Sequence, residues 1–215
     1  MTGDIFKIPN LISIGRLIFL IPAGYFLSQP GVNDRFYALA CLTVAAATDY
    51  LDGYLARKLN QQTRLGLLLD PLCDKIMAGV LALLLIVYRD FPVWLAAVII
   101  GRDLLIMVGG LALKSKVEGI PPSNLSGKYA FASVAVLLIS HVILFDFGII
   151  VFTGLALFFL TLSLFMYGRS LIIVLRGGEI PRFADRPAYL ALRSAASWIV
   201  SLVFLYKLAE FIGWL

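Results

Sequence analysis

The feature that most constrains this fold is a series of apolar runs, each about 20 residues long, that recur along the whole chain. A helix of ~20 residues is long enough to cross ~30 Å of hydrocarbon. Hydrophobic residues make up 61% of the 215 positions and charged residues 14%, and the mean hydropathy is +0.95. A soluble domain has about a quarter charged residues. No strand-like alternation is visible, so we predict an all-α, polytopic membrane protein.

Six of the apolar runs are predicted to be transmembrane helices. They cover residues 10–28, 36–56, 66–88, 91–113, 129–148 and 150–175. A seventh run, about 194–215, contains Lys207 and Glu210; it could cross the membrane, lie along its surface or pack on a partner chain. We therefore predict a membrane domain over residues 1–182, followed by a C-terminal helical extension over residues 183–215 that forms a seventh span or an interfacial helix.

Basic residues predict the orientation of the chain. Between the predicted spans they gather in alternate connections, and the opposite loops hold only Arg35 and Arg89. By the positive-inside rule, the N-terminus and the loops 57–65 and 114–128 face the cytoplasm. The net charge of +5 then suits anionic lipid headgroups and argues against a nucleic-acid partner. Arg16 interrupts the first run, so we do not expect a cleavable signal peptide there, and because no transit peptide is visible we expect a bacterial inner membrane.

Four aspartates stand near the predicted cytoplasmic ends of two neighbouring spans. Asp49 and Asp52 are three residues apart in the second span, and Asp70 and Asp74 are four apart in the third. Residues at these spacings share one face of a helix. Because the connection 57–65 is short, the two helices should be antiparallel neighbours. We therefore expect the four carboxylates to converge at one depth.

Four converging carboxylates repel one another in a low dielectric, and divalent cations remove that repulsion. Carboxylate oxygens suit Mg²⁺, Mn²⁺ or Ca²⁺, and two such ions can bridge a pyrophosphate. The only histidine, His141, lies inside an apolar run and is interpreted as a core residue, which argues against zinc. The alternative is a structural network of ion pairs, which would join Asp49 or Asp52 to Arg57 and Asp74 to Lys75 or Arg64.

Small and basic residues accompany the aspartates. Gly53, Ala56 and Gly66 leave space for a bulky ligand to approach the backbone. Arg57 can pair with a phosphate oxygen. Pro71 is expected to kink its helix. Together with the aspartates, these residues predict a site for a phosphate-containing ligand.

The residues form the pattern D-x2-D-G-x2-A-R-x8-G-x3-D-x3-D without a departure, and this resembles the signature of the CDP-alcohol phosphotransferase family. The resemblance covers about residues 5–176. It implies a six-helix membrane fold, a homodimer, and a cytoplasm-facing site with two metal ions, Mg²⁺ or Mn²⁺. By the same resemblance, the metal ligands are Asp49, Asp52, Asp70 and Asp74, the general base is Asp74, and the CDP site is lined by Asn10, Gly53, Ala56, Arg57 and Gly66.

The resemblance also implies the reaction. The hydroxyl of an acceptor alcohol attacks the β-phosphorus of CDP-diacylglycerol and releases CMP. A transporter or proton relay is the competing class, because it also places carboxylates in membrane helices. Such proteins carry them toward the midplane, often on broken helices of repeated halves. Here the carboxylates cluster at one end and no repeat is visible, which favours the enzyme.

Two segments bear on the acceptor. The run Pro9-Asn10-x2-Ser13-x2-Arg16 and the run Asp70-Pro71-Leu72-Cys73-Asp74-Lys75 are similar to segments of phosphatidylglycerophosphate and cardiolipin synthases. The cations predicted to receive an acceptor phosphate are Arg16, Lys75, Arg102, Lys128 and Arg169. For Arg102, pairing with a neighbouring carboxylate is an equal alternative. We predict glycerol 3-phosphate as the acceptor. Because Gly101-Arg102-Asp103 looks closer to cardiolipin synthases, phosphatidylglycerol is the alternative.

Overall fold

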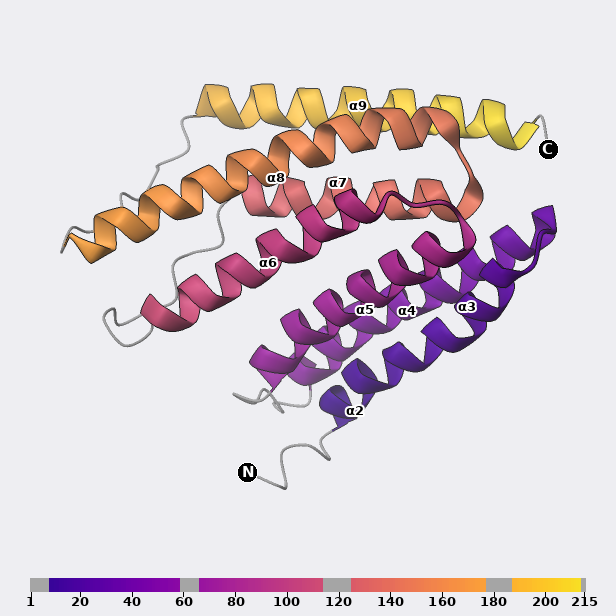
Figure 1. Cartoon of the computed structure of the whole chain (residues 1–215), viewed down its shortest axis with the longest axis horizontal. Coiled ribbons are helices and arrows are strands. Elements are labelled where there is room, and N and C mark those ends of the chain that lie inside the picture. Colours follow the sequence, from indigo (N-terminus) through magenta and orange to yellow (C-terminus); the bar gives the residue numbers. More distant parts are fainter. Residues whose placement is uncertain (1–7, 59–65, 114–124, 177–186, 214–215) are drawn as a thin grey trace. The chain divides into compact units, whose positions relative to one another are not determined.

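The computed structural model describes residues 8–58, 66–113, 125–176 and 187–213, and every element in these ranges is a helix (Figure 1). The all-α prediction is confirmed for this part of the chain. The elements are α2 (Ile8–Gly15), the 3₁₀ turn η1 (Arg16–Phe19), α3 (Leu20–Ser28), α4 (Val32–Lys58), α5 (Gly66–Tyr88), α6 (Val93–Leu113), α7 (Leu125–Ile143), α8 (Asp146–Leu175) and α9 (Pro187–Gly213).

The chain divides into two compact units. The first contains α2 to α5, the start of α6 up to Ile100, and His141–Leu144; the second contains the rest of α6 and α7 together with α8 and α9. In the first unit, α2 and α3 pack against α4 and α5. Fully buried alanines, Ala23 in α3 and Ala38 in α4, let these helices approach closely.

His141 is buried, and its ring meets Phe91 edge-on with 4.7 Å between the ring centroids. The interpretation of this residue as part of the core is therefore confirmed.

Two breaks in the first unit follow from local chemistry. α3 ends at Ser28 because Gln29 is extended before Pro30. α5 ends at Tyr88, where Asp90 has a φ of 52° and the N–H of Phe91 donates to the carbonyl of Leu85 at 3.2 Å. Arg89 joins the two breaks, because its Nη2 donates to the carbonyl of Gln29 at 3.2 Å. Burial, followed by the nearby charge of Arg35, lowers the pKa of Arg89 below its ordinary value.

The boundary between α7 and α8 corrects a sequence prediction. The spans 129–148 and 150–175 place the break too late, because α7 ends at Ile143 and α8 begins at Asp146. Leu144 adopts a left-handed φ of 57°, and the N–H of Phe145 donates to the carbonyl of Ser140 at 2.8 Å. Gly148 lies inside α8, where a Cβ would collide with Ser140 and Phe145. The glycine therefore allows a close approach to the end of α7 and does not mark the break.

Two helices in the described part of the chain are long and apolar enough to cross a membrane: Leu125–Ile143 and the segment Asp146–Ile173 of α8. The count of six spans stays a prediction. α5 is one helix from Gly66 to Tyr88 and includes Pro71, and the kink expected there stays a prediction. α9 begins at Pro187, seven residues before the predicted start at 194, and proline is well suited to the first position of a helix.

Candidate functional site

The predicted acidic site lies on α4 and α5. Both aspartate pairs fall on helical backbone, as their spacing predicts, with Asp49 and Asp52 in α4 and Asp70 and Asp74 in α5. Of these four, the structure describes only the side chain of Asp74. The other predicted metal and CDP residues have side chains outside the described part of the chain, so their roles stay predictions: Asn10, Asp49, Asp52, Gly53, Ala56, Arg57, Gly66 and Asp70.

Asp74 forms an ion pair with Arg16. The Oδ1 atom of Asp74 lies 3.3 Å from Nη1 of Arg16, which is contributed by η1. The Arg16 side chain is 1% exposed and that of Asp74 is 38% exposed. The predicted base is thus joined to a cation predicted to receive the acceptor phosphate. The structure gives Arg16 a partner within the protein, and the phosphate-binding role stays a prediction.

The position of Arg16 follows from its sequence context. A guanidinium in an apolar helix must face protein or a polar cavity, and burial of the charge requires a partner. Ser13 precedes Arg16 by three residues and is also buried, as expected for one helix face. The depth of Arg16 was a signal that it needed a carboxylate. The structural alternative predicted from the sequence paired Asp74 with Lys75 or Arg64 and did not include Arg16.

The Asp74 side chain is partly exposed, and carboxylate oxygens are hard donors that suit a divalent cation. No group of three His, Cys, Asp or Glu side chains that could hold a metal occurs among the residues that the structure describes. That search includes only Asp74 of the four predicted ligands. The carboxylate oxygens of Asp74 are of the kind that Mg²⁺ or Mn²⁺ prefers, and the site with four aspartates stays a prediction.

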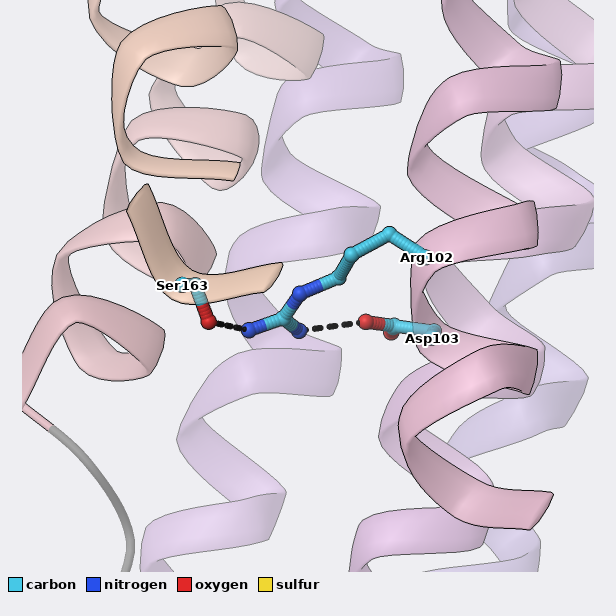
Figure 2. A network of polar contacts seen from close by, with 3 residues as sticks. All are labelled: Arg102, Asp103 and Ser163. Carbon is cyan, nitrogen blue, oxygen red and sulfur yellow. Dashed lines mark hydrogen bonds and ion pairs between the residues drawn. The ribbon is translucent and has the colours of Figure 1, made fainter. Parts of the chain in front are cut away.

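A second polar cluster lies in the other unit, between α6 and α8 (Figure 2). Nη1 of Arg102 donates to Oδ1 of Asp103 at 2.6 Å, and Nη2 donates to Oγ of the fully buried Ser163. The side chain of Arg102 is 14% exposed, and its buried Nε has no hydrogen-bond partner within the described structure. The pairing with a neighbouring carboxylate that the sequence suggested for Arg102 is therefore observed.

α7 passes close to this cluster at Gly127. A Cβ at this position would lie 3.4 Å from Nη2 of Arg102 and 3.7 Å from Oγ of Ser163. These are ordinary van der Waals distances, so α7 lies next to the guanidinium at this position. Neither Gly127 nor Ser163 is among the site residues predicted from the sequence. The only signal for Ser163 was a hydroxyl in a mostly apolar helix that also contains other polar residues.

The other predicted phosphate-binding cations differ in exposure. Lys75 in α5 is half-buried, whereas Lys128 in α7 and Arg169 in α8 are exposed. Lys128 and Arg169 belong to the same unit as Arg102. Their exposed charges are available to an anionic ligand, and the role predicted for each of them stays a prediction.

Comparison with known proteins connects these observations to a family. The family model described as CDP-alcohol phosphatidyltransferase matches residues 6–174. A CDP-diacylglycerol–glycerol-3-phosphate 3-phosphatidyltransferase of Pseudomonas fluorescens is 47% identical over 46% of this chain and 52% of its own length. One from Aquifex aeolicus is 32% identical over 62% of this chain and 74% of its own. A cardiolipin synthase (CMP-forming) of Streptomyces coelicolor is 36% identical over 60% and 61%.

Proposed function

Because the chain belongs to the CDP-alcohol phosphatidyltransferase family, we propose that it transfers a phosphatidyl group from CDP-diacylglycerol to the hydroxyl of glycerol 3-phosphate. The products are phosphatidylglycerophosphate and CMP. The observation that carries this proposal is the family match, which includes all eight residues of the pattern from Asp49 to Asp74. Two of the relatives compared above are named for this same reaction, although one of them is matched over only half of its length.

In the proposed mechanism, Asp74 accepts the proton of the acceptor hydroxyl. The hydroxyl oxygen forms a bond to the β-phosphorus of the donor, and the bond from that phosphorus to the oxygen bridging to CMP breaks, so that CMP leaves. The ion pair with Arg16 fixes the Asp74 carboxylate from one side, while more than a third of the side chain stays exposed. Arg16 is therefore a positioning residue for the base.

The proposed metal ligands are Asp49, Asp52, Asp70 and Asp74. Bound Mg²⁺ or Mn²⁺, in two ions, would neutralise the pyrophosphate of the donor. Support for this assignment comes from the hard oxygen donors and from the helical spacing of both aspartate pairs. The cytidine diphosphate is proposed to bind along the small and polar positions of the same region, namely Asn10, Gly53, Ala56, Arg57 and Gly66.

The acceptor phosphate is proposed to bind the exposed cations Lys128 and Arg169. Arg102 belongs to the same predicted set, but both of its terminal nitrogens already donate, to Asp103 and to Ser163. Each of these nitrogens has a second N–H, and the Nε–H has no hydrogen-bond partner in the described structure, so Arg102 can still donate to a phosphate. Lys128 and Arg169 are the exposed cations of the set, and Arg16 and Lys75 complete it.

Phosphatidylglycerol is the second candidate acceptor, and the product would then be cardiolipin. The specific observation in its favour is the Arg102–Asp103 pair, because the carboxylate offsets the arginine charge within the protein. A site with less net positive charge suits a phosphodiester with one negative charge better than a phosphomonoester. The similarity to a cardiolipin synthase of Streptomyces coelicolor agrees with this alternative.

We place the protein in a membrane, because two described helices are long and apolar enough to span it and the family consists of membrane enzymes. The proposed location is a bacterial inner membrane, with the site facing the cytoplasm and the chain acting as a homodimer. The charge of the loops supports this orientation.

An acceptor panel tests the proposal. The purified full-length chain, with CDP-diacylglycerol and Mg²⁺ or Mn²⁺, is expected to release CMP when glycerol 3-phosphate is added, and EDTA should stop the reaction. Parallel reactions receive phosphatidylglycerol, serine or inositol phosphate, and the lipid product is identified by mass spectrometry. Cardiolipin formed from phosphatidylglycerol would select the alternative. No CMP with any alcohol would overturn the enzyme proposal.

A further inference from the structure

The C-terminal helix α9 lies beyond the family match, which ends at residue 174. It runs antiparallel to α8 in the same unit and packs beside its first turns (Figure 1). Three aromatic contacts hold it there. The ring centroids of Phe145 and Phe211 are 5.1 Å apart, those of Phe145 and Phe204 are 5.7 Å apart, and those of Phe152 and Phe204 are 5.2 Å apart.

These contacts define a register between the two helices. From Phe145 to Phe152 the chain advances seven residues along α8, and from Phe211 to Phe204 it goes back seven residues along α9. Seven residues are about two turns of a helix. Over this length α9 therefore runs along α8, itself long and apolar enough to span a membrane, and does not cross it steeply.

The exposed surface of α9 is apolar around most of its circumference. Trp198 is 67% exposed, Ile199 62% and Val200 40%, and successive residues of a helix are rotated by about 100°. These three consecutive side chains alone cover about 200° of the surface. Other large apolar side chains are also exposed on α9: Leu202, Val203, Leu205, Tyr206 and Ile212. A helix that lies on a membrane surface needs a charged or strongly polar face. The exposed Ser194, Ser197 and Ser201 share one side of α9, but the exposed Leu205 and Ile212 continue that side as an apolar surface.

The charges of α9 are confined to its ends. No charged residue occurs from 194 to 206. Near the C-terminal end, Lys207 and Glu210 bind each other at 2.8 Å. The aromatic register puts Glu210 level with Asp146, the first residue of α8. Asp146 and Glu210 therefore lie at one level, as expected where a membrane meets water, while Arg169 of α8 and Arg193 of α9 stand toward the other ends of the two helices.

We propose that α9 is a seventh membrane span that lies along α8, with its exposed apolar surface covered by lipid acyl chains. The proposal rests on the placement of α8 in the membrane and does not depend on the reaction. The six predicted spans would bring the chain back to the side of its N-terminus, and a seventh would carry the C-terminus across. The arginines between α8 and α9 would remain on the cytoplasmic side, and Glu210 would lie near the opposite surface.

Reporter fusions to the full-length chain in a bacterial host test the topology. A C-terminal alkaline phosphatase should be active and a C-terminal green fluorescent protein should be dark, because only the phosphatase matures outside the cytoplasm. The matched control carries the same reporters within residues 114–124, where the opposite result is expected. Bright fluorescence with an inactive phosphatase at the C-terminus would overturn the seventh span. Since the reporters need no turnover, failure of the proposed reaction would leave this result intact.

Single cysteines test what covers the helix. In a Cys41→Ser, Cys73→Ala background, Trp198→Cys and Leu202→Cys should lose labelling by a water-soluble maleimide in intact membranes. Glu210→Cys should be labelled from the outer side. Labelling of the mid-helix cysteines in intact membranes would contradict a span. Oxidation of Trp198→Cys to a disulfide-linked dimer would instead put a second copy of the chain where the proposal puts lipid.

Discussion

Arg16 and Arg102 each bind an aspartate, but the two pairs are built differently. Arg16 reaches Asp74 from another helix, and the arginine is almost fully buried while the aspartate is half-exposed. Arg102 binds the residue next to it, Asp103, and also donates to Ser163 of α8. The first pair joins a partly exposed carboxylate to a buried cation, which suits a base. In the second pair, Nη1 and Nη2 each donate a hydrogen bond within the protein. These bonds hold the guanidinium in one place, which suits a fixed positive charge beside a ligand.

Loss of the Asp74 carboxylate should have the largest effect. Asp74→Asn removes the proposed base but keeps the size of the side chain, and general base catalysis contributes about 10²- to 10⁴-fold. We expect CMP release to fall by that factor at saturating Mg²⁺, with donor binding largely kept. Activity restored by more metal would mean that Asp74 acts as a ligand alone. Near-normal turnover of Asp74→Asn would show that Asp74 is not the base, and the Arg16–Asp74 pair would then have no catalytic role that the Arg102–Asp103 pair lacks.

Replacement of Arg16 should have a smaller effect. Arg16→Met removes the partner of Asp74, and loss of a residue that orients a metal ligand lowers activity by about 10- to 100-fold. Because the proposed role is positioning, kcat should fall more than KM, and Arg16→Lys should recover part of the loss. A higher KM for the acceptor with unchanged kcat would instead support the predicted contact of Arg16 with the acceptor phosphate. Thermal unfolding in detergent separates either result from misfolding.

Changes at Asp103 test the second pair. Asp103→Asn removes the charge that offsets Arg102 but keeps an Oδ1 acceptor for Nη1, so the site should attract a phosphomonoester more strongly. An ion pair of this exposure is worth up to about 1 kcal/mol, which corresponds to a change of about fivefold in the KM for glycerol 3-phosphate. Asp103→Glu is the matched control that keeps the charge. If the two variants have the same KM, the charge of Asp103 has no part in acceptor choice.

The smallest effect is expected at Gly127. In Gly127→Ala, the added methyl would lie 3.4 Å from Nη2 of Arg102, which the flexible side chain can accommodate, and alanine favours a helix by about 1 kcal/mol. We expect thermal stability close to that of the parent protein and a small change in the acceptor KM. Gly148→Ala is the contrasting control, because its methyl would collide with Ser140 and Phe145 and should lower stability by about 1–3 kcal/mol. Equal stability of Gly127→Ala and Gly148→Ala would contradict the tighter packing described around Gly148.

Local features of the sequence were enough to predict the helices and the spacing of the aspartates. The length of the apolar runs predicts helices, and Pro30 and Asp90 stand at breaks that turn chemistry explains. The break at Leu144 escaped prediction, because leucine has no preference for the left-handed φ that it adopts there. The packing of Phe145 and Gly148 beside Ser140 accompanies this turn.

The sequence by itself determined that four aspartates fall on helical backbone near the ends of two helices, because helical periodicity is a local property. It also showed that Arg16 and Arg102 needed partners, because an apolar helix cannot leave a charge alone. Only the tertiary structure decided which partners they have, since Asp74 and Ser163 are brought to them by helices distant in sequence. The place of α9 along α8 was decided in the same way, because aromatic contacts between distant segments leave no periodic signal in the chain.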